Sequence, residues 1–117
     1  MNDIKINTQD GITKFMTTIE NRIDDDFAKK INSICTFEIG IPDKPEVWTL
    51  DCTKSSNRLY KGSPETTPVC TIVIRHISDC IAIIQGEINP TVAFMQGKIK
   101  IKGDISTALK MQSILSK

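Results

Sequence analysis

The hydrophobic and polar positions change period three times between Asn89 and Leu115, over the stretch NPTVAFMQGKIKIKGDISTALKMQSIL. Asn89 is a helix N-cap type and Pro90 suits the first helical position, so a short helix is predicted to begin at Pro90. Gly97 is predicted to end this helix, because glycine readily takes the positive φ that closes helices. From Lys98 to Lys102 lysine and isoleucine alternate, which predicts a strand with one apolar face.

A longer amphipathic helix is predicted after that strand. Gly103 turns the chain, and Asp104 is placed to cap the helix. Apolar residues then recur at helical spacing at Ile105, Ala108, Leu109, Met111, Ile114 and Leu115. The whole stretch therefore predicts helix, half-buried strand and amphipathic helix. It contains no His, no Cys and no cluster of carboxylates that could carry out chemistry.

The beginning of the chain predicts two helices. Asp10 is predicted to be the N-cap of the first helix, and the polar residues Met1 to Gln9 before it are expected to be loose. The apolar stripe of this helix consists of Ile12, Phe15, Met16, Ile19 and Ile23. The acidic run Asp24–Asp26 is predicted to cap and begin the second helix. It does not predict a cation loop, which needs alternating oxygen ligands, a Gly and a closing Glu.

Alternation with a period of two predicts four strands in the middle of the chain. They are Ser33–Gly40, Val47–Thr53, a short edge strand at Leu59 and Tyr60, and Val69–Arg75. The short turn after the first strand makes the first two antiparallel. The residues predicted to face inward are Cys35, Phe37, Ile39, Ile41, Trp48, Leu50, Cys52, Cys70, Ile72 and Ile74, with Ile34, Thr36, Glu38, Thr49, Asp51 and Thr53 outward. Three inward residues are cysteines, which are small, so the sheet can leave room above it.

A further helix completes the predicted set. Ser78 is expected to cap it, Gly86 to close it, and its apolar residues are Cys80, Ile81, Ile83 and Ile84. The predicted order is therefore α-α-β-β-β-β-α-α-β-α. This order is typical of an α+β domain with a five-stranded, mostly antiparallel sheet and about five helices on one face. Helices packed closely on the sheet would make an ordinary core, whereas helices held apart would enclose an apolar cavity, and the pattern leaves both open.

Composition and charge exclude several classes of function. A chain of 117 residues suits a single domain over residues 1–117. The 15 basic and 14 acidic residues nearly balance and aromatics make up only 5%, so the composition does not indicate a nucleic-acid-binding surface. No apolar run approaches the roughly 20 residues of a membrane span, and the amino terminus lacks the apolar core of a signal peptide. We therefore expect a soluble protein that stays in the compartment where it is made.

The residues that could carry chemistry are scattered. Cys35, Cys52, Cys70 and Cys80 form no C-x-x-C pair, so we expect reduced, structural thiols and no metal site. His76 has no Ser or Cys partner at motif spacing, which leaves a small hydrolase or acyltransferase as the weakest alternative. We therefore expect no catalytic residues, no enzyme activity and no cofactor. The lysine row of the Lys98–Lys102 strand is either a solvated face or a contact for anionic lipid headgroups.

The string NPTVAFMQGKIKIKGD followed by ALKMQSIL resembles the carboxy-terminal signature of the sterol carrier protein type 2 family of lipid-binding domains. The likeness is specific from Gly86 to Leu115 and extends more loosely over the whole chain. It implies that the helices and sheet enclose a hydrophobic tunnel, partly covered by the carboxy-terminal helix. It also implies a non-enzymatic carrier of sterols, phospholipids, fatty acids or fatty acyl-CoA. A buried methylene contributes about 0.8 kcal/mol, so a chain of about 16 carbons offers roughly 12 kcal/mol without specific polar contacts.

This resemblance implies which side chains contact the lipid. The matched AFMQG segment contributes Phe94 and Met95, and Thr91 lies one turn earlier on the same helix. The final helix contributes Ile105, Leu109 and Gln112, with Gln112 as a polar group for a hydroxyl or carbonyl of the ligand. The opposite wall of the tunnel is expected to contain Phe15, Ile19, Trp48, Ile81 and Ile84.

Two features differ from the family pattern. Its members often end in a peroxisomal tripeptide of the Ala/Ser-Lys-Leu type, whereas this sequence ends in Leu115-Ser116-Lys117. We therefore expect a cytoplasmic protein, with the peroxisome as the alternative. The family domain is also often fused to a thiolase or a dehydrogenase, and no such partner is present in this sequence.

We expect a monomer whose partners are the lipid ligand and, transiently, a membrane surface. The alternative from another class is a protein-docking or regulatory module of the same fold with a closed cavity. In that case the apolar face of a helix would bind a protein and not cover a lipid. Binding of a fluorescent lipid separates the two interpretations.

Overall fold

A five-stranded sheet organises the structure, a computed structural model that describes residues 8–41 and 43–116. The described residues form six helices and five strands. In chain order these are α1 (Thr8–Arg22), α2 (Asp25–Ile31), β1 (Ile34–Ile39), β2 (Glu46–Asp51), β3 (Leu59–Lys61), β4 (Cys70–Ile74), α3 (Ile77–Ile84), α4 (Pro90–Met95), β5 (Lys100–Gly103), α5 (Ile105–Lys110) and α6 (Gln112–Leu115). The predicted α+β class is confirmed.

The sheet is mostly antiparallel, as predicted, but it contains one parallel pair. Its strand order is β3-β2-β1-β4-β5, and only β1 and β4 run parallel, with Cys35 opposite Cys70 and Ile39 opposite Ile74. The other three pairs are antiparallel. Because parallel strands end at the same edge of a sheet, the segments that follow β1 and β4 lie next to each other. The prediction that Ile41 faces inward is wrong, because β1 ends at Ile39 and Ile41 is exposed in the turn that follows.

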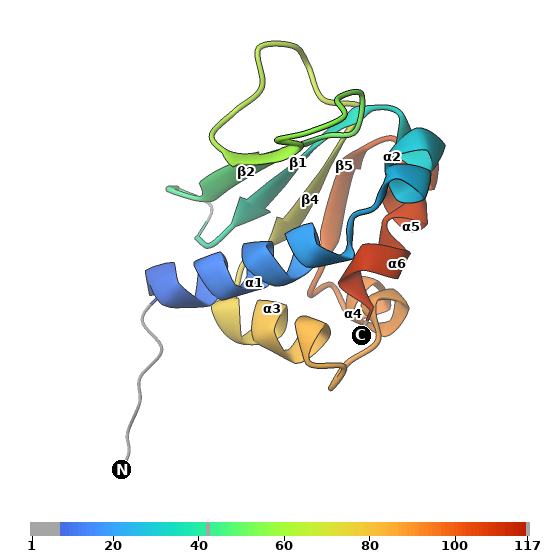
Figure 1. The fold of residues 1–117 in the computed structure, drawn as a ribbon. Coiled ribbons are helices and arrows are strands. Elements are labelled where there is room, and N and C mark those ends of the chain that lie inside the picture. Colours follow the sequence, from blue (N-terminus) through green and yellow to red (C-terminus); the bar gives the residue numbers. More distant parts are fainter. Residues whose placement is uncertain (1–7, 42, 117) are drawn as a thin grey trace.

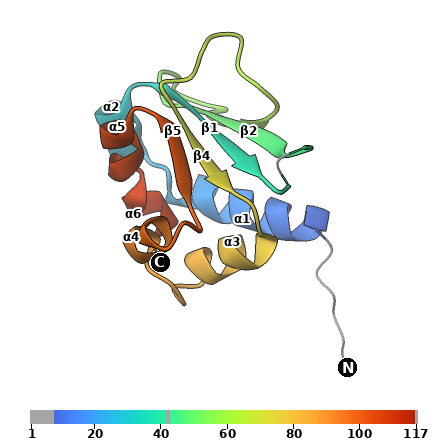
Figure 2. The same ribbon diagram turned by 180° about the vertical axis from the view of Figure 1, so that it is seen from behind.

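The helices lie together on one face of the sheet. Figures 1 and 2 show α1 and α3 crossing this face next to each other, with α4, α5 and α6 gathered at the β5 edge. The predicted stripe of α1 is buried from Ile12 to Ile19, and the Phe15 ring meets Phe37 of β1 edge to face at a centroid distance of 6.4 Å. Such aromatic pairs add about 0.5–1.5 kcal/mol to the burial of apolar area. At this point the helix layer rests directly on the sheet.

Three predicted helix caps are confirmed by hydrogen bonds. The Asp24 carboxylate accepts from the Phe27 amide at 2.8 Å, and the Asn89 side chain accepts from the Thr91 amide at 2.8 Å. Asp104 caps α5 by accepting from the Ser106 amide at 3.1 Å. The hydroxyl of Thr107 also donates to Asp104, and these hydrogen bonds hold the pKa of Asp104 below its usual value.

Other predicted boundaries are wrong. Helix α1 begins at Thr8, so Asp10 lies in its first turn and is not the N-cap; most of the stretch expected to be loose, residues 1–7, lies outside the described residues. Helix α3 begins at Ile77, because the chain leaves β4 in an extended conformation at His76, whose carbonyl already accepts from the Asp79 amide. Ser78 therefore lies inside the helix.

The predicted final helix is two helices. The chain bends at Met111, which is the C-cap of α5 and the N-cap of α6. The preceding strand has the predicted alternation, since Ile99 is buried, Ile101 is half-buried and the lysines between and beside them are exposed. Gly103 then turns the chain at φ +86°, and a Cβ at this position would lie 2.5 Å from the Val69 carbonyl oxygen. Only glycine fits this approach.

The sheet face opposite the helices is also partly covered. Thr36 and Thr49 point to this face as predicted, but they are buried, as is Thr71. The Thr36 and Thr71 hydroxyls hydrogen-bond each other at 2.6 Å, and the Thr49 hydroxyl donates to the Gly62 carbonyl at 2.7 Å. Segment 63–68 lines a pocket together with Thr36 and Thr71 and so lies over this part of the sheet face.

Candidate functional site

Exposed apolar side chains are concentrated on α4 and α5. Seven large apolar side chains among the described residues are exposed, and five of them belong to these two helices. We call these five the α4–α5 apolar set: Val92, Phe94, Met95, Ile105 and Leu109. Met95 is 78% exposed, Ile105 51% and Leu109 46%. Both helices were predicted to contribute lipid contacts, and the five large apolar side chains of this set face solvent in the structure.

Two predicted polar residues join α4 to α6. The Gln112 side-chain amide donates a hydrogen bond to the Thr91 hydroxyl. Thr91 precedes Phe94 by three residues in α4, so these two side chains share one side of that helix, whereas Gln112 lies in α6, beyond the break at Met111 that separates it from Leu109 of α5. The structure therefore brings the predicted residues of α4 and those of the carboxy-terminal helices to one part of the molecule.

The carboxy-terminal helices differ in how they are held. Ile105 and Leu109 of α5 are exposed, whereas Met111, Ile114 and Leu115 at and after the bend are buried in the core. Burial of a large apolar side chain stabilises its position by roughly 1.5–3 kcal/mol. Helix α6 is thus anchored in the core, while the outward side of α5 has no cover among the described residues.

Arg22 of α1, whose role the sequence analysis missed, fixes α6 by hydrogen bonds to its backbone carbonyls. Its guanidinium donates to the carbonyls of Ile114 at 3.0 Å, Leu115 at 3.1 Å and Ile84 at 3.0 Å. These carbonyls lie at the ends of α6 and α3, where helix carbonyls have no partner inside the helix. One side chain of α1 therefore ties together the carboxyl ends of two other helices. A single arginine in the last turn of a helix gives no sequence signal for such a role.

The residues predicted for the opposite wall lie deeper. Phe15 and Ile19 of α1 are fully buried, Ile84 of α3 is 5% exposed, and Ile81 is half-buried against the same core. Trp48 is half-buried on β2, where its indole N–H donates to the Glu46 carboxylate at 2.6 Å. The predicted lining thus falls into a buried or half-buried group on α1, α3 and β2 and an exposed group on α4 and α5. Contact of either group with a lipid remains a prediction.

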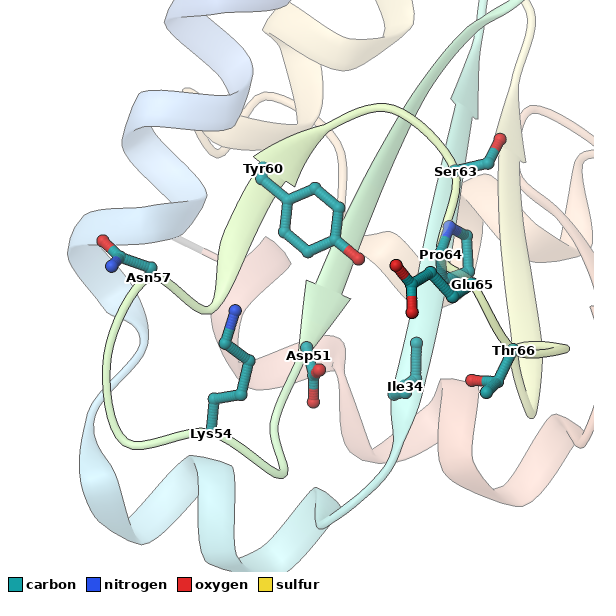
Figure 3. A pocket seen from close by; sticks show the side chains of 9 residues that line it. All are labelled: Ile34, Asp51, Lys54, Asn57, Tyr60, Ser63, Pro64, Glu65 and Thr66. Atoms are coloured by element: carbon teal, nitrogen blue, oxygen red, sulfur yellow. The ribbon is translucent and has the colours of Figure 1, made fainter.

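An open pocket of about 610 Å³ lies on the sheet face opposite the helices. Seven of the nine residues that line it have polar or charged side chains, and the Lys54 ammonium lies 5.6 Å from the centre of the Tyr60 ring. Figure 3 shows the Tyr60 hydroxyl and the Glu65 carboxylate pointing into the same space. The residues predicted to contact lipid do not line this pocket.

The four cysteines are buried, and none of them forms a disulfide bond within the described residues. Cys35 and Cys70 are neighbours on β1 and β4, and the Cys70 thiol donates to the Cys35 sulfur at 3.3 Å. Burial raises the pKa of Cys52 to about 11 and the pKa of Cys80 to about 12. The hydrogen bond between the other two thiols raises the pKa of Cys35 and lowers the pKa of Cys70. Cys52 and Cys80, whose thiols remain protonated at neutral pH, are therefore poor nucleophiles and poor metal ligands. Within the described ranges, no three His, Cys, Asp or Glu side chains come close enough to hold a metal ion.

Comparison with known proteins assigns the chain to a family. The model of the SCP-2 sterol transfer family matches residues 13–116. The chain belongs to the SCP-2 sterol transfer family. The resemblance in the carboxy-terminal stretch is thereby confirmed, and it extends over nearly the whole sequence.

Two curated relatives support this membership. Non-specific lipid-transfer protein-like 1 from Caenorhabditis elegans is 39% identical over 100 residues, which cover 83% of this chain and 83% of that protein. Sterol carrier protein 2 from Bos taurus is 34% identical over 101 residues, which cover 82% of this chain but only 18% of that protein. The SCP-2 region therefore occurs both in a protein of similar length and in a much longer one.

Solved structures share the fold. Sterol Carrier Protein 2 Like 2 from Aedes aegypti superimposes with a TM-score of 0.73 at 21% identity, covering 89% of this chain and 95% of that one. Sterol Carrier Protein-2 from Aedes aegypti, solved with the C16 fatty acid palmitate, gives a TM-score of 0.60 at 15% identity and covers 86% of this chain and 94% of that one.

In the described part of this chain, no helix has the length and apolar character to cross a membrane.

Proposed function

We propose that this SCP-2 family chain is a non-enzymatic lipid carrier, which takes up sterols, phospholipids, fatty acids or fatty acyl-CoA and moves them between membranes or to enzymes. The observation that carries the proposal is the α4–α5 apolar set, which exposes five large apolar side chains on two helices whose Ala93 and Ala108 belong to the buried apolar core. The names of the relatives, which include a non-specific lipid-transfer protein, and the palmitate complex of a structural neighbour support this choice of ligand.

The physical basis of binding is the removal of apolar surface from water. Leu109, Ile105 and Met95 are each about half exposed or more. Covering apolar area stabilises a complex by roughly 25 cal/mol per Å² before ordering costs. An acyl chain or a sterol can cover these side chains without specific polar contacts, so the proposed carrier accepts lipids of several classes.

The lipid is proposed to enter between α4 and α5 as α5 shifts. Helix α6 is held by the buried Met111 and Ile114 and by the Arg22 hydrogen bonds. Helix α5 is buried only through Thr107 and Ala108, and we propose that it moves about the break at Met111. The chain of the lipid would then pass Phe94 and Leu109. It would continue toward the buried group of Phe15, Ile19, Trp48, Ile81 and Ile84, with Thr91 and Gln112 available to a polar headgroup.

A carrier fits the described chemistry better than a hydrolase does. The four thiols are buried, and burial raises the pKa of Cys52 and Cys80, which disfavours a thiolate nucleophile. We further propose that the carrier acts as a monomer in the cytoplasm and meets membranes only transiently. The exposed α4–α5 apolar set would also suit the alternative, a module that docks another protein.

A titration with an uncharged fluorescent sterol tests the proposal. We expect saturable one-to-one uptake by the wild type, and at least a tenfold weaker affinity in Leu109→Asp, because a carboxylate in the path of the lipid must lose its hydration. Val69→Asp is the matched control, since Val69 is similarly exposed at 41% but lies outside α4 and α5. Its affinity should equal that of the wild type.

Two results would count against the carrier. Absence of uptake by the wild type, in the presence of added sterol and no other protein, favours the docking module. Equal affinity of Leu109→Asp and wild type means that the lipid does not pass between α4 and α5. Far-ultraviolet circular dichroism of each variant separates lost binding from lost folding.

A further inference from the structure

A second pocket lies at the other end of α1, where the two parallel strands finish. Its volume is about 480 Å³, and its walls come from the ends of β1 and β4, the beginning of α3 and the first turns of α1. Figures 1 and 2 show these segments converging at the end of α1 far from α4, α5 and α6. Ile12 lines this pocket, whereas Arg22 contacts α6, and ten residues of helix span about 15 Å.

The interior of this pocket is apolar. Four isoleucines line it. Ile12 and Ile39 are almost completely buried and form the floor, Ile77 is half-buried, and Ile41 is 64% exposed at the rim. Exposure of Ile41 beside a hollow leaves apolar surface that a short hydrocarbon segment can cover. The volume is within the range of roughly 300–1,000 Å³ that is typical of small-molecule pockets.

The rim is basic. Lys44, Arg75 and His76 line the pocket and are exposed, and none of the ion pairs among the described residues involves them. The one carboxylate in the lining, Glu46, is already engaged. It accepts from the Trp48 indole at 2.6 Å and pairs with the Lys61 ammonium at 3.4 Å. The lysine and arginine charges on the rim therefore have no fixed counter-charge in the pocket.

The backbone at the amino end of α3 also favours an anion in this pocket. Helix α3 begins at this pocket with His76 as its N-cap, and the His76 side chain makes no capping hydrogen bond. The amino end of a helix carries partial positive charge and favours a nearby anion. This effect adds to the two rim cations, which on their own already define the sign of the ligand.

We propose that this basic pocket binds a single-chain anionic lipid, with its carboxylate between Lys44 and Arg75 and the adjoining methylenes on the isoleucine floor. The inference rests on the proposed function for the class of ligand, but it concerns a separate site. An inorganic anion would leave the isoleucines uncovered, and a neutral lipid would leave the cations unpaired. A lipid with two chains offers more apolar surface than this pocket can cover.

Nuclear magnetic resonance of the ¹⁵N-labelled full chain tests this site directly, with dodecanoate as the anionic probe and dodecanol as its uncharged counterpart. The titration is done in Leu109→Asp, so that the α4–α5 route contributes as little as possible. We expect dodecanoate to shift the amide signals of Gly40, Ile41 and Ser78 in a saturable way. Dodecanol should shift them far less, and added salt should weaken the dodecanoate effect because the rim charges are exposed.

A variant without the two rim cations provides a second test of the proposed carboxylate site. The double substitution Lys44→Gln and Arg75→Gln should weaken dodecanoate binding at these amides at least tenfold, while Lys54→Gln, which removes a cation from a different pocket, should leave binding unchanged. Both proteins should keep the dispersed spectrum of the folded chain. A Lys44→Arg variant should bind like the wild type.

The result that overturns the inference is a lack of shifts at Gly40, Ile41 and Ser78, or equal shifts with dodecanol or in the double variant. This outcome is distinguishable from failure of the carrier proposal. If Leu109→Asp takes up neutral sterol like the wild type, the α4–α5 route is wrong, yet the dodecanoate titration still reports on the basic pocket.

Discussion

At the scale of residues, Arg22 is the clearest example of a side chain whose role depends on the tertiary structure. Its guanidinium meets the carbonyls of Ile84, Ile114 and Leu115, which belong to two helices far apart in the sequence. Hydrogen bonds from a charged donor contribute more than neutral ones, and partly buried carbonyls left without a donor are destabilising. Arg22 therefore fixes the position of α6 relative to α1 and α3.

We expect Arg22→Met to lower the free energy of unfolding by about 2–3 kcal/mol, since three carbonyls lose their donor while the apolar stem is kept. Urea unfolding followed by circular dichroism measures the change. Arg75→Met is the control, because none of the hydrogen bonds or ion pairs among the described residues involves Arg75. A loss of less than about 0.5 kcal/mol in Arg22→Met, the usual range for a surface substitution, would contradict the clamping role.

At the scale of elements, local rules predicted the helices and strands, and long-range contacts determined the rest. The caps at Asp24, Asn89 and Asp104 could be predicted because a cap depends on a few consecutive residues. The parallel pairing of β1 with β4, the bend at Met111 and the burial of the outward threonines could not. Each depends on segments that are distant in the chain, and alternation with a period of two is the same in parallel and antiparallel strands.

Hydrogen exchange should distinguish α5 from α6. We expect the amides of α5 to exchange faster than those of α6, because Ile105 and Leu109 face solvent while Ile114 and Leu115 are buried. Saturating sterol should slow exchange in α4 and α5 at least tenfold. Helix α2, another short helix, is the control and should not change. Equal protection of α5 and α6, or an effect of sterol on α2 as large as on α5, would contradict a mobile α5.

At the scale of the whole molecule, one helix separates two features of different chemistry. The α4–α5 apolar set lies toward the carboxyl end of α1, and the basic pocket lies at its amino end. The family and the α+β class could be predicted from the carboxy-terminal stretch and the order of elements. The exposure of the α4–α5 apolar set and the basic pocket could not, because both arise where separate segments converge. The net charge of +1 leaves such local features to determine ligand preference.

Native mass spectrometry of the freshly purified protein tests lipid carriage most directly, because a carrier with an apolar site should retain a lipid through purification. We predict a species heavier than the bare chain by one lipid, released on denaturation and restored by adding a sterol or a phospholipid. A spectrum that shows only the bare chain, both after purification and after incubation with excess lipid, would contradict the carrier function.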